Sequence, residues 1–155
     1  MKIFATFLIF GLSIINTFSQ IIRVENAKYF DKNHDLYNGV YEEFFDNGNK
    51  KLEMHLLNGE QDSVTIIYFD DGRINELRSY SKGLMHGKWE TYNDKGQKLA
   101  EAWYRRDKKD GIWRIWDDNG TLRYEMPYSN GNKIGTWKIF NEKGVLISER
   151  KYESD

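Results

Sequence analysis

The chain has 155 residues and a formal net charge of −1 at pH 7. This balance argues against nucleic acid as a partner, because nucleic-acid-binding proteins are usually basic overall or carry a basic stripe. The absence of cysteine excludes disulfides and lipid-modified cysteines, so stability must come from packing and strand pairing. Aromatic residues make up 15% of the chain and charged residues 30%, a composition that favours half-buried strands over disorder.

Residues 1–19 are predicted to form a signal peptide. Lys2 gives a short positive start, and residues 3–15 form an uncharged, apolar run that is shorter than the about 20 residues a bilayer core requires. Thr17 and Ser19 fit the small-residue positions before a cleavage point, which we place between Ser19 and Gln20. We therefore expect export to the periplasm, the outer surface or the medium, with no integral membrane span after cleavage. An uncleaved N-terminal anchor is the alternative interpretation.

Residues 20–38 form a lead-in, with a candidate capping strand through Lys28-Tyr29-Phe30. Residues 39–155 then repeat with a period of 24, in units 39–62, 63–86, 87–110, 111–134 and 135–155. Such self-similarity is the signature of a repeat architecture. The first marker of the repeat is glycine in every unit but the second: Gly39, Ser63, Gly87, Gly111, Gly135.

Four further columns recur in register with this marker. Nine residues after it stands a second glycine: Gly48, Gly72, Gly96, Gly120, Gly144. Two residues after it stand Tyr41, Thr65, Trp89, Trp113 and Trp137, and five after it Phe44, Tyr68, Tyr92, Trp116 and Phe140. Seventeen after it stand Leu56, Tyr80, Tyr104, Tyr128 and Tyr152. Chance spacing of glycines would not carry the aromatic residues with it.

The second glycine predicts a tight turn in each repeat. An acidic residue lies two positions before it, as in Asp94-Lys95-Gly96, which fits a type I turn closed by a left-handed glycine in a bulge. A type I′ turn would force Lys95 and Lys143 to a positive φ. Each repeat is therefore predicted to be a hairpin, for example with strands at 88–93 and 99–104.

The residue pattern of the strands predicts two different faces. The second strands share a glutamate column that we expect to face water, and the tyrosine column three residues on points to the other, core side. The glutamates are Glu53, Glu101, Glu125 and Glu149, with Leu77 in the second repeat. Trp89 and Tyr92 are an odd number of residues apart, so a regular strand would place them on opposite faces. This spacing indicates either that aromatic residues cover both faces of the sheet or that the strand contains a bulge.

Short polar linkers such as 81–87 and 129–135 connect the hairpins. The expected fold is all-β: an elongated antiparallel meander of five 24-residue β-hairpin repeats with ten strands, preceded by the signal peptide. Pro127 lies inside a predicted strand, so a bulge or an outward-facing backbone position is expected there. The charged stretch 149–155 suits an exposed edge.

The unit Gly-x-Trp-x-x-Tyr-x-x-x-Gly-x-x-Leu, followed by Tyr-x-x-Gly, resembles the MORN-repeat variant family. Residues 87–104 and 111–128 carry the motif, and the likeness covers about residues 39–155. Bacterial members of this variant are often labelled as the antitoxin of a YwqK-like toxin–antitoxin pair, and better-known MORN proteins are linked to membrane lipid and protein contacts. This sequence departs from the pattern at Ser63 and Thr65, and an export signal does not suit immunity to an intracellular toxin.

No catalytic, cofactor or metal site is expected. His34, His55 and His86 show no ligand spacing, and the pairs Asp70-Asp71 and Asp117-Asp118 occupy the predicted turn position. Residues 83–88 begin like a phosphate-binding loop, but Trp89 stands where that loop needs serine or threonine. No Ser–His–Asp arrangement is readable.

The expected function is that of an exported, non-catalytic scaffold for a protein partner. We interpret Trp89, Trp113 and Trp137 as packing residues, and choose Trp103 and Trp116 as candidate binding residues, since Trp103 falls on the glutamate face. The basic pair Arg105 and Arg106 is a candidate contact for an anionic partner. The alternatives are an antitoxin or immunity protein, and glycan or cell-wall binding through exposed aromatic rings.

Overall fold

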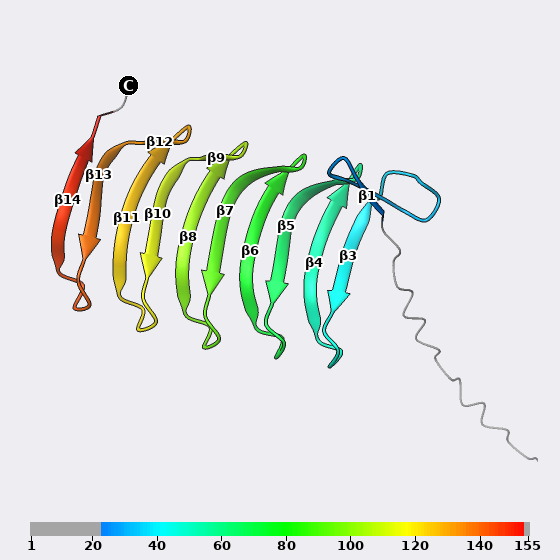
Figure 1. Cartoon of the computed structure of the whole chain (residues 1–155), viewed down its shortest axis with the longest axis horizontal. Coiled ribbons are helices and arrows are strands. Elements are labelled where there is room, and N and C mark those ends of the chain that lie inside the picture. The colour runs from blue at the N-terminus through cyan, green and yellow to red at the C-terminus, as the bar shows by residue number, and fades with distance from the viewer. Residues whose placement is uncertain (1–22, 154–155) are drawn as a thin grey trace, which may run out of the picture.

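The computed structural model describes residues 23–153, and the regular elements in this range are β-strands (Figure 1). The predicted signal peptide and its cleavage point lie outside the described residues. Among those described, no helix has the length and apolar character to cross a membrane. The strands are β1 (Arg23–Glu25), β2 (Lys28–Phe30), β3 (Gly39–Phe44), β4 (Lys50–Leu57), β5 (Glu60–Tyr68), β6 (Ile74–Ser81), β7 (Leu84–Tyr92), β8 (Lys98–Arg105), β9 (Lys108–Lys109), β10 (Gly111–Trp116), β11 (Leu122–Ser129), β12 (Asn132–Lys133), β13 (Gly135–Phe140) and β14 (Leu146–Tyr152).

The predicted antiparallel meander is confirmed. Strands β3 to β14 form one 12-stranded sheet in chain order, in which β9 and β12 are short extensions that pair with β8 and β11, so ten strands make up the main path. The predicted strands at 88–93 and 99–104 correspond to β7 and β8, but β7 begins earlier, at Leu84. The linkers of the sequence analysis are therefore largely strand.

The turns at the lower ends of the strands in Figure 1 are the predicted ones. In the third repeat, Gly96 has φ 77° and donates its N–H to the carbonyl of Asn93 at 2.9 Å, and Lys95 has no positive φ. The Asn93 side chain accepts the backbone N–H of Lys95 and of Gln97. The prediction of a type I turn closed by a left-handed glycine is confirmed.

The turns at the upper ends are two-residue hairpins rather than polar loops. Lys82 and Gly83 both have positive φ, 52° and 76°, which is the type I′ pattern. The second residue of each upper turn also donates its N–H to a carbonyl 22 residues earlier, which from the second upper turn onward belongs to the strand that follows the preceding turn. These donor–acceptor pairs are Gly59–Tyr37, Gly83–Gln61, Asp107–Met85 and Gly131–Lys109, at 2.8–3.0 Å.

A bulge separates each repeat from the next. Between β6 and β7 the register passes from the pair Arg78 and Trp89 to the pair Tyr80 and Met85, so three residues of β7 lie opposite one of β6. The marker Gly87 lies in this bulge with φ 99°. Pro127 lies where the ladder from β11 to β13 is interrupted in the same way, so the bulge predicted there is confirmed.

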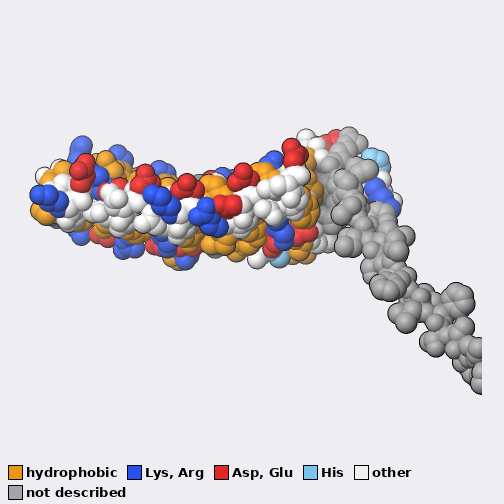
Figure 2. All heavy atoms as spheres, turned by 90° about the horizontal axis from the view of Figure 1, so that it is seen from below, with side chains coloured by type: hydrophobic (Ala, Val, Ile, Leu, Met, Phe, Trp, Pro, Cys, Tyr) orange, Lys and Arg blue, Asp and Glu red, His pale blue; other side chains and the backbone are white. Residues whose placement is uncertain are grey.

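The sheet is a single layer with little conventional core. Figure 2 shows it edge-on as a thin slab with acidic and basic side chains interspersed along its length. The most buried apolar side chains are Met54 and Leu56, 3% and 4% exposed, which lie in β4 at the N-terminal end of the sheet. The tyrosine column lies opposite the marker glycines and on the other face from the glutamates, as predicted, but no second layer of strands within residues 23–153 covers it.

Residues 23–38 cap the N-terminal end. The strand predicted through Lys28-Tyr29-Phe30 is β2, which pairs with β1 in a separate two-stranded sheet. Tyr29 donates its backbone N–H to the carbonyl of Gly59 at 2.9 Å, and Lys28 forms an ion pair with Glu60 at 3.4 Å. The lead-in therefore docks on the first upper turn.

We expect Ser63→Gly to stabilise the protein. Ser63 occupies the bulge position with φ 74°, a conformation that costs a residue with a Cβ about 1–2 kcal/mol, partly offset by the greater freedom of glycine in the unfolded chain. The free energy of unfolding should rise by about 0.5–1 kcal/mol in urea titrations followed by tryptophan fluorescence. The reverse change, Gly87→Ser, should destabilise, because its Cβ would lie 3.1 Å from the Cβ of Ser79. A loss of stability in Ser63→Gly would contradict this account.

Candidate binding surface

One face of the sheet carries a continuous ladder of aromatic rings, and we call it the ladder face. Successive ring centroids are 4.9–5.5 Å apart, with interplanar angles of 51–63°, the tilted geometry that aromatic pairs prefer. The rings belong, in order along the sheet, to Tyr80, Trp89, Tyr104, Trp113, Tyr128, Trp137 and Tyr152. Burial raises the pKa of the Tyr104 and Tyr128 hydroxyls, so both are neutral at physiological pH.

A hydrogen bond fixes each tryptophan of the ladder. The indole N–H of Trp113 donates to the backbone carbonyl of Trp103 on the preceding strand at 3.0 Å. Trp89 and Trp137 make the same bond across their own bulges, to Ser79 at 3.0 Å and to Pro127 at 3.1 Å. The bulge aims these carbonyls at the indoles, so the marker and tryptophan columns form one structural unit.

The marker glycine also makes room for this arrangement. A Cβ added to Gly111 would lie 3.1 Å from the Cβ of Trp103, closer than side chains tolerate without a shift. Directly across from Gly111 stands Tyr128, whose ring packs against that of Trp113 in the ladder. At Gly111 the positive φ and the close packing both favour glycine.

The ladder face is open over the third to fifth repeats. The lead-in docks at the N-terminal end of the sheet, where Tyr29 donates its backbone N–H to the carbonyl of Gly59 at 2.9 Å. Farther along, Ile115 and Ile139 of the same face are 39% and 37% exposed. Within residues 23–153 no second layer of strands covers them.

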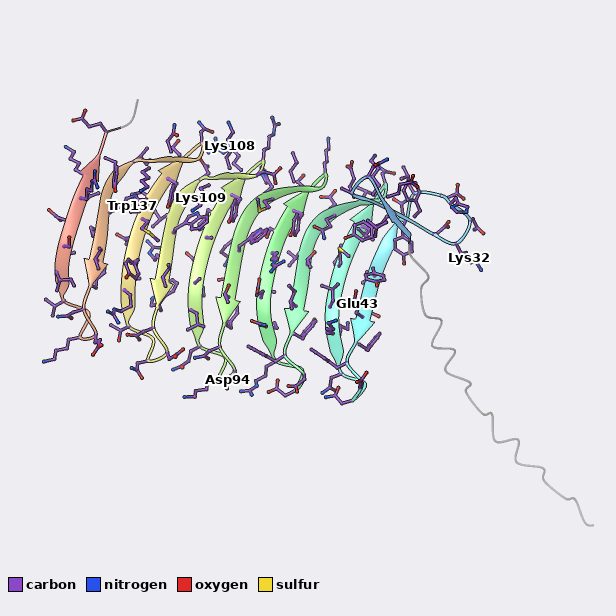
Figure 3. The ribbon with its side chains drawn as sticks, in the orientation of Figure 1. Lys32, Glu43, Asp94, Lys108, Lys109 and Trp137 are labelled. Atoms are coloured by element: carbon purple, nitrogen blue, oxygen red, sulfur yellow. The ribbon has the colours of Figure 1, made fainter. Side chains whose placement is uncertain are left out.

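Two lysines lie over the rings at equivalent positions of consecutive repeats. Lys109 Nζ is 4.1 Å from the ring centroid of Trp113, and Lys133 Nζ is 4.4 Å from that of Trp137, both within cation–π range. Figure 3 shows Lys109 and Trp137 toward the upper ends of their strands. In β7 to β14 every glutamate lies on the opposite face by strand alternation: Glu90, Glu101, Glu125 and Glu149. The open part of the ladder face is thus aromatic and basic.

The opposite face, which we call the charged face, holds a network of ion pairs. Glu90 has a side chain only 7% exposed and pairs with Lys98 and, at 3.1 Å, with Lys88. The network continues across the strands with N–O distances of 3.0–3.5 Å, through Lys98–Glu101, Glu101–Arg114, Arg114–Glu125 and Glu125–Lys138.

The prediction that the glutamate column faces water is wrong for most of its members. Glu53, Glu101 and Glu125 are covered by lysine and arginine side chains of their own and neighbouring strands, whereas Glu149 on the last strand is exposed. The exception in the column, Leu77, pairs with Ile66, so an apolar pair replaces a charged one in the second repeat.

The structure does not gather the four predicted binding residues into one patch. Trp103, 41% exposed, and Trp116 both lie on the charged face, but Trp103 is near the upper end of β8 and Trp116 is the last residue of β10. Arg105 forms an ion pair with Asp110 at 2.5 Å, and Arg106 lies in the upper turn. The predicted packing role of Trp89, Trp113 and Trp137 agrees with the ladder.

The remaining polar candidates serve the turns. Asp117 accepts the backbone N–H groups of Asn119 and Thr121, and Asp71 pairs with Arg73. His55 lies 3.5 Å from Glu53. Among the described residues, no group of three or more histidine, aspartate or glutamate side chains could hold a metal ion.

The family described as MORN repeat variant matches the chain at residues 37–58, 109–130 and 133–154. The chain is a MORN-repeat variant protein. Each matched segment starts two residues before a marker glycine and spans one first strand, one lower turn and one second strand. In the two C-terminal matched segments the glycine, tryptophan and tyrosine columns supply the bulge, the indole donor and the ladder ring, whereas the first segment has Tyr41 and Leu56 in the last two columns. No curated protein matches the chain.

We expect the ion-pair network to make stability depend on pH. Burial alone would raise the pKa of Glu90, but hydrogen bonds from Lys98 and Lys88 outweigh it and hold this pKa below the usual 4.5. A carboxylate with a lowered pKa in the folded state contributes stability above about pH 4.5 and loses it as pH falls through the folded-state value. The urea midpoint should therefore fall between pH 6 and pH 3.

The variant Glu90→Gln should flatten this pH dependence and lower the free energy of unfolding at pH 7 by about 1.5 kcal/mol, because two lysines lose a charged acceptor. Glu142→Gln, in an exposed lower turn, is the matched control and should leave both quantities unchanged. Identical pH profiles for wild type and Glu90→Gln would refute the role of the network.

Proposed function

We propose that the protein is an exported, non-catalytic scaffold that binds an extended protein partner along the ladder face of its third to fifth repeats. The observation that supports this most is the continuous, regular run of rings, which lies on a face where Ile115 and Ile139 are exposed beside it. Each repeat adds a similar strip of surface, which suits an extended partner. Aromatic residues are enriched in protein interfaces, where a ring contributes a large contact area.

The charge of the ladder face specifies the partner further. Lys109, Lys133 and Arg150 lie beside the rings, and the glutamates of these strands are on the charged face. An acidic segment that crosses the strands would meet one cation in each repeat. Because each repeat adds two strands, equivalent positions of neighbouring repeats are about 9–10 Å apart. The proposed partner is therefore acidic where it contacts the sheet.

Export is the part of the proposal that rests on residues 1–19. An antitoxin role rests on family resemblance alone, which is an associational argument, and the signal peptide favours a partner outside the cytoplasm. Glycan binding is the second candidate, since aromatic rings and cations also suit an acidic polysaccharide.

Photo-crosslinking tests the proposed face. We expect p-benzoylphenylalanine at Ile115 or Ile139 to capture a protein from envelope fractions of the native host. The same residue at Ile112 is the matched control, because Ile112 is equally exposed, at 39%, but lies on the charged face. Capture at Ile112 alone, or at none of the three positions, would refute the protein-binding proposal, and a change in tryptophan fluorescence on titration with an acidic glycan would then favour the second candidate.

A pair of substitutions at one position tests the charge argument. Ile139→Glu should weaken partner capture, since it places a negative charge on the ladder face, whereas Ile139→Lys should preserve it. Equal effects of the two variants would show that the partner is not acidic at this contact.

A further inference from the structure

The last strand of the sheet has an open edge. Within residues 23–153, β14 pairs with β13 on one side and with no strand on the other. An edge strand presents unpaired backbone N–H and C=O groups that can bind another strand. Leu146 and Ile147 of this strand are exposed apolar residues, and Ile147 is 62% exposed.

Earlier second strands show what a strand beside β14 would have to provide. Where β11 meets β13, Glu125 pairs with Lys138 at 3.0 Å. The residue before that lysine, Trp137, donates its indole N–H to the carbonyl of Pro127 and packs its ring against Tyr128. The junction of β8 and β10 repeats these contacts with Glu101 and Arg114, with the indole of Trp113 on the carbonyl of Trp103, and with the ring of Tyr104.

Among residues 23–153, the corresponding groups of β14 have no strand on their outer side. Glu149 lies opposite Lys138 but makes no ion pair within this part of the chain. The carbonyl of Lys151 stands where those of Trp103 and Pro127 accept an indole. Tyr152 contacts one ring of the ladder, that of Trp137. Beside these groups is a hollow of about 290 Å³ whose lining includes Trp137, Ile139, Arg150 and Tyr152.

We propose that β14 binds an extended segment of another protein as an added antiparallel strand, and that this segment carries an aromatic residue followed directly by lysine or arginine. The aromatic side chain would face the hollow and donate to the Lys151 carbonyl if it is tryptophan. The basic side chain, one residue on, would point to the charged face and pair with Glu149. This edge site adjoins the C-terminal end of the ladder face, but it requires backbone pairing along β14, which binding to the ladder face does not.

Charge complementarity argues against a second copy of the chain in a head-to-tail array. The free edge at the other end of the sheet is β3, where the matching residues are Tyr41 and Glu42. Continuing the register would set Glu42, which already pairs with Lys50, opposite Glu149, so a second copy would not supply the cation that Arg114 and Lys138 provide at the last two junctions. The aromatic–basic pair therefore has to come from another protein.

A peptide copied from residues 133–141, Lys-Ile-Gly-Thr-Trp-Lys-Ile-Phe-Asn, is a direct probe. Labelled with fluorescein and titrated with the protein, it should give saturable anisotropy. The peptide change Lys138→Glu should weaken binding about fivefold, since it replaces an attractive cross-strand pair by a repulsive one. Glu149→Lys in the protein should weaken binding of the original peptide to a similar extent and restore binding of the Lys138→Glu peptide.

Glu142→Lys is the control for net charge. Like the wild type, this variant should bind the original peptide more tightly than the Lys138→Glu peptide. Amide hydrogen exchange should show protection of β14 on binding, and circular dichroism should confirm that each variant is folded. Absence of binding to folded protein, equal binding of the two peptides, protection of β11 instead of β14, or dimers that bury β14 in sedimentation would each overturn the proposal. Failure here, with partner capture at Ile115 and Ile139 intact, removes the edge site and leaves the proposed function standing.

Discussion

The hydrogen bond from a tryptophan indole to a carbonyl on the preceding strand is the interaction on which the sheet depends. It forms because the marker glycine adopts a positive φ and opens a bulge, as at Gly87. The bulge aims the carbonyl at the indole and leaves room for the facing tyrosine. The same contact recurs at Trp113 and Trp137, so it joins the second to fifth repeats at a fixed register. At the junction of the first and second repeats, Thr65 takes the place of the tryptophan.

Because the sheet is a single layer, its stability is spread over both surfaces. On the ladder face, neighbouring rings pack against one another and so reduce their exposure to solvent. On the charged face, the ion pairs around Glu90, Glu101 and Glu125 link neighbouring strands. A partner that covers the ladder face would supply the second layer that the sheet lacks. The same features that stabilise each repeat therefore create a surface suited to binding, and no cleft is needed.

The sequence predicted the repeat, the lower turns and the separation of faces, because these follow from local rules for glycine and strand alternation. The upper type I′ turns were missed. Asn58-Gly59 is the dipeptide typical of such turns, but the equivalent positions of other repeats hold Lys82-Gly83 and Arg106-Asp107, which are not typical of them. The buried ion pairs could not be predicted, since the contact of Lys98 with Glu90 depends on the register of two strands. The positions of Lys109 and Lys133 over the rings were also missed, because they depend on the conformation of the upper turns.

The most direct test of this account is to remove one indole donor and keep an aromatic ring. Trp113→Phe should lower the free energy of unfolding in urea by about 1 kcal/mol, since the backbone carbonyl of Trp103 loses its indole donor. Trp103→Phe, which changes a tryptophan on the charged face and keeps that carbonyl, should change stability by less than about 0.5 kcal/mol. Equal losses in the two variants, or no loss in Trp113→Phe, would contradict the claim that the indole bond joins the repeats.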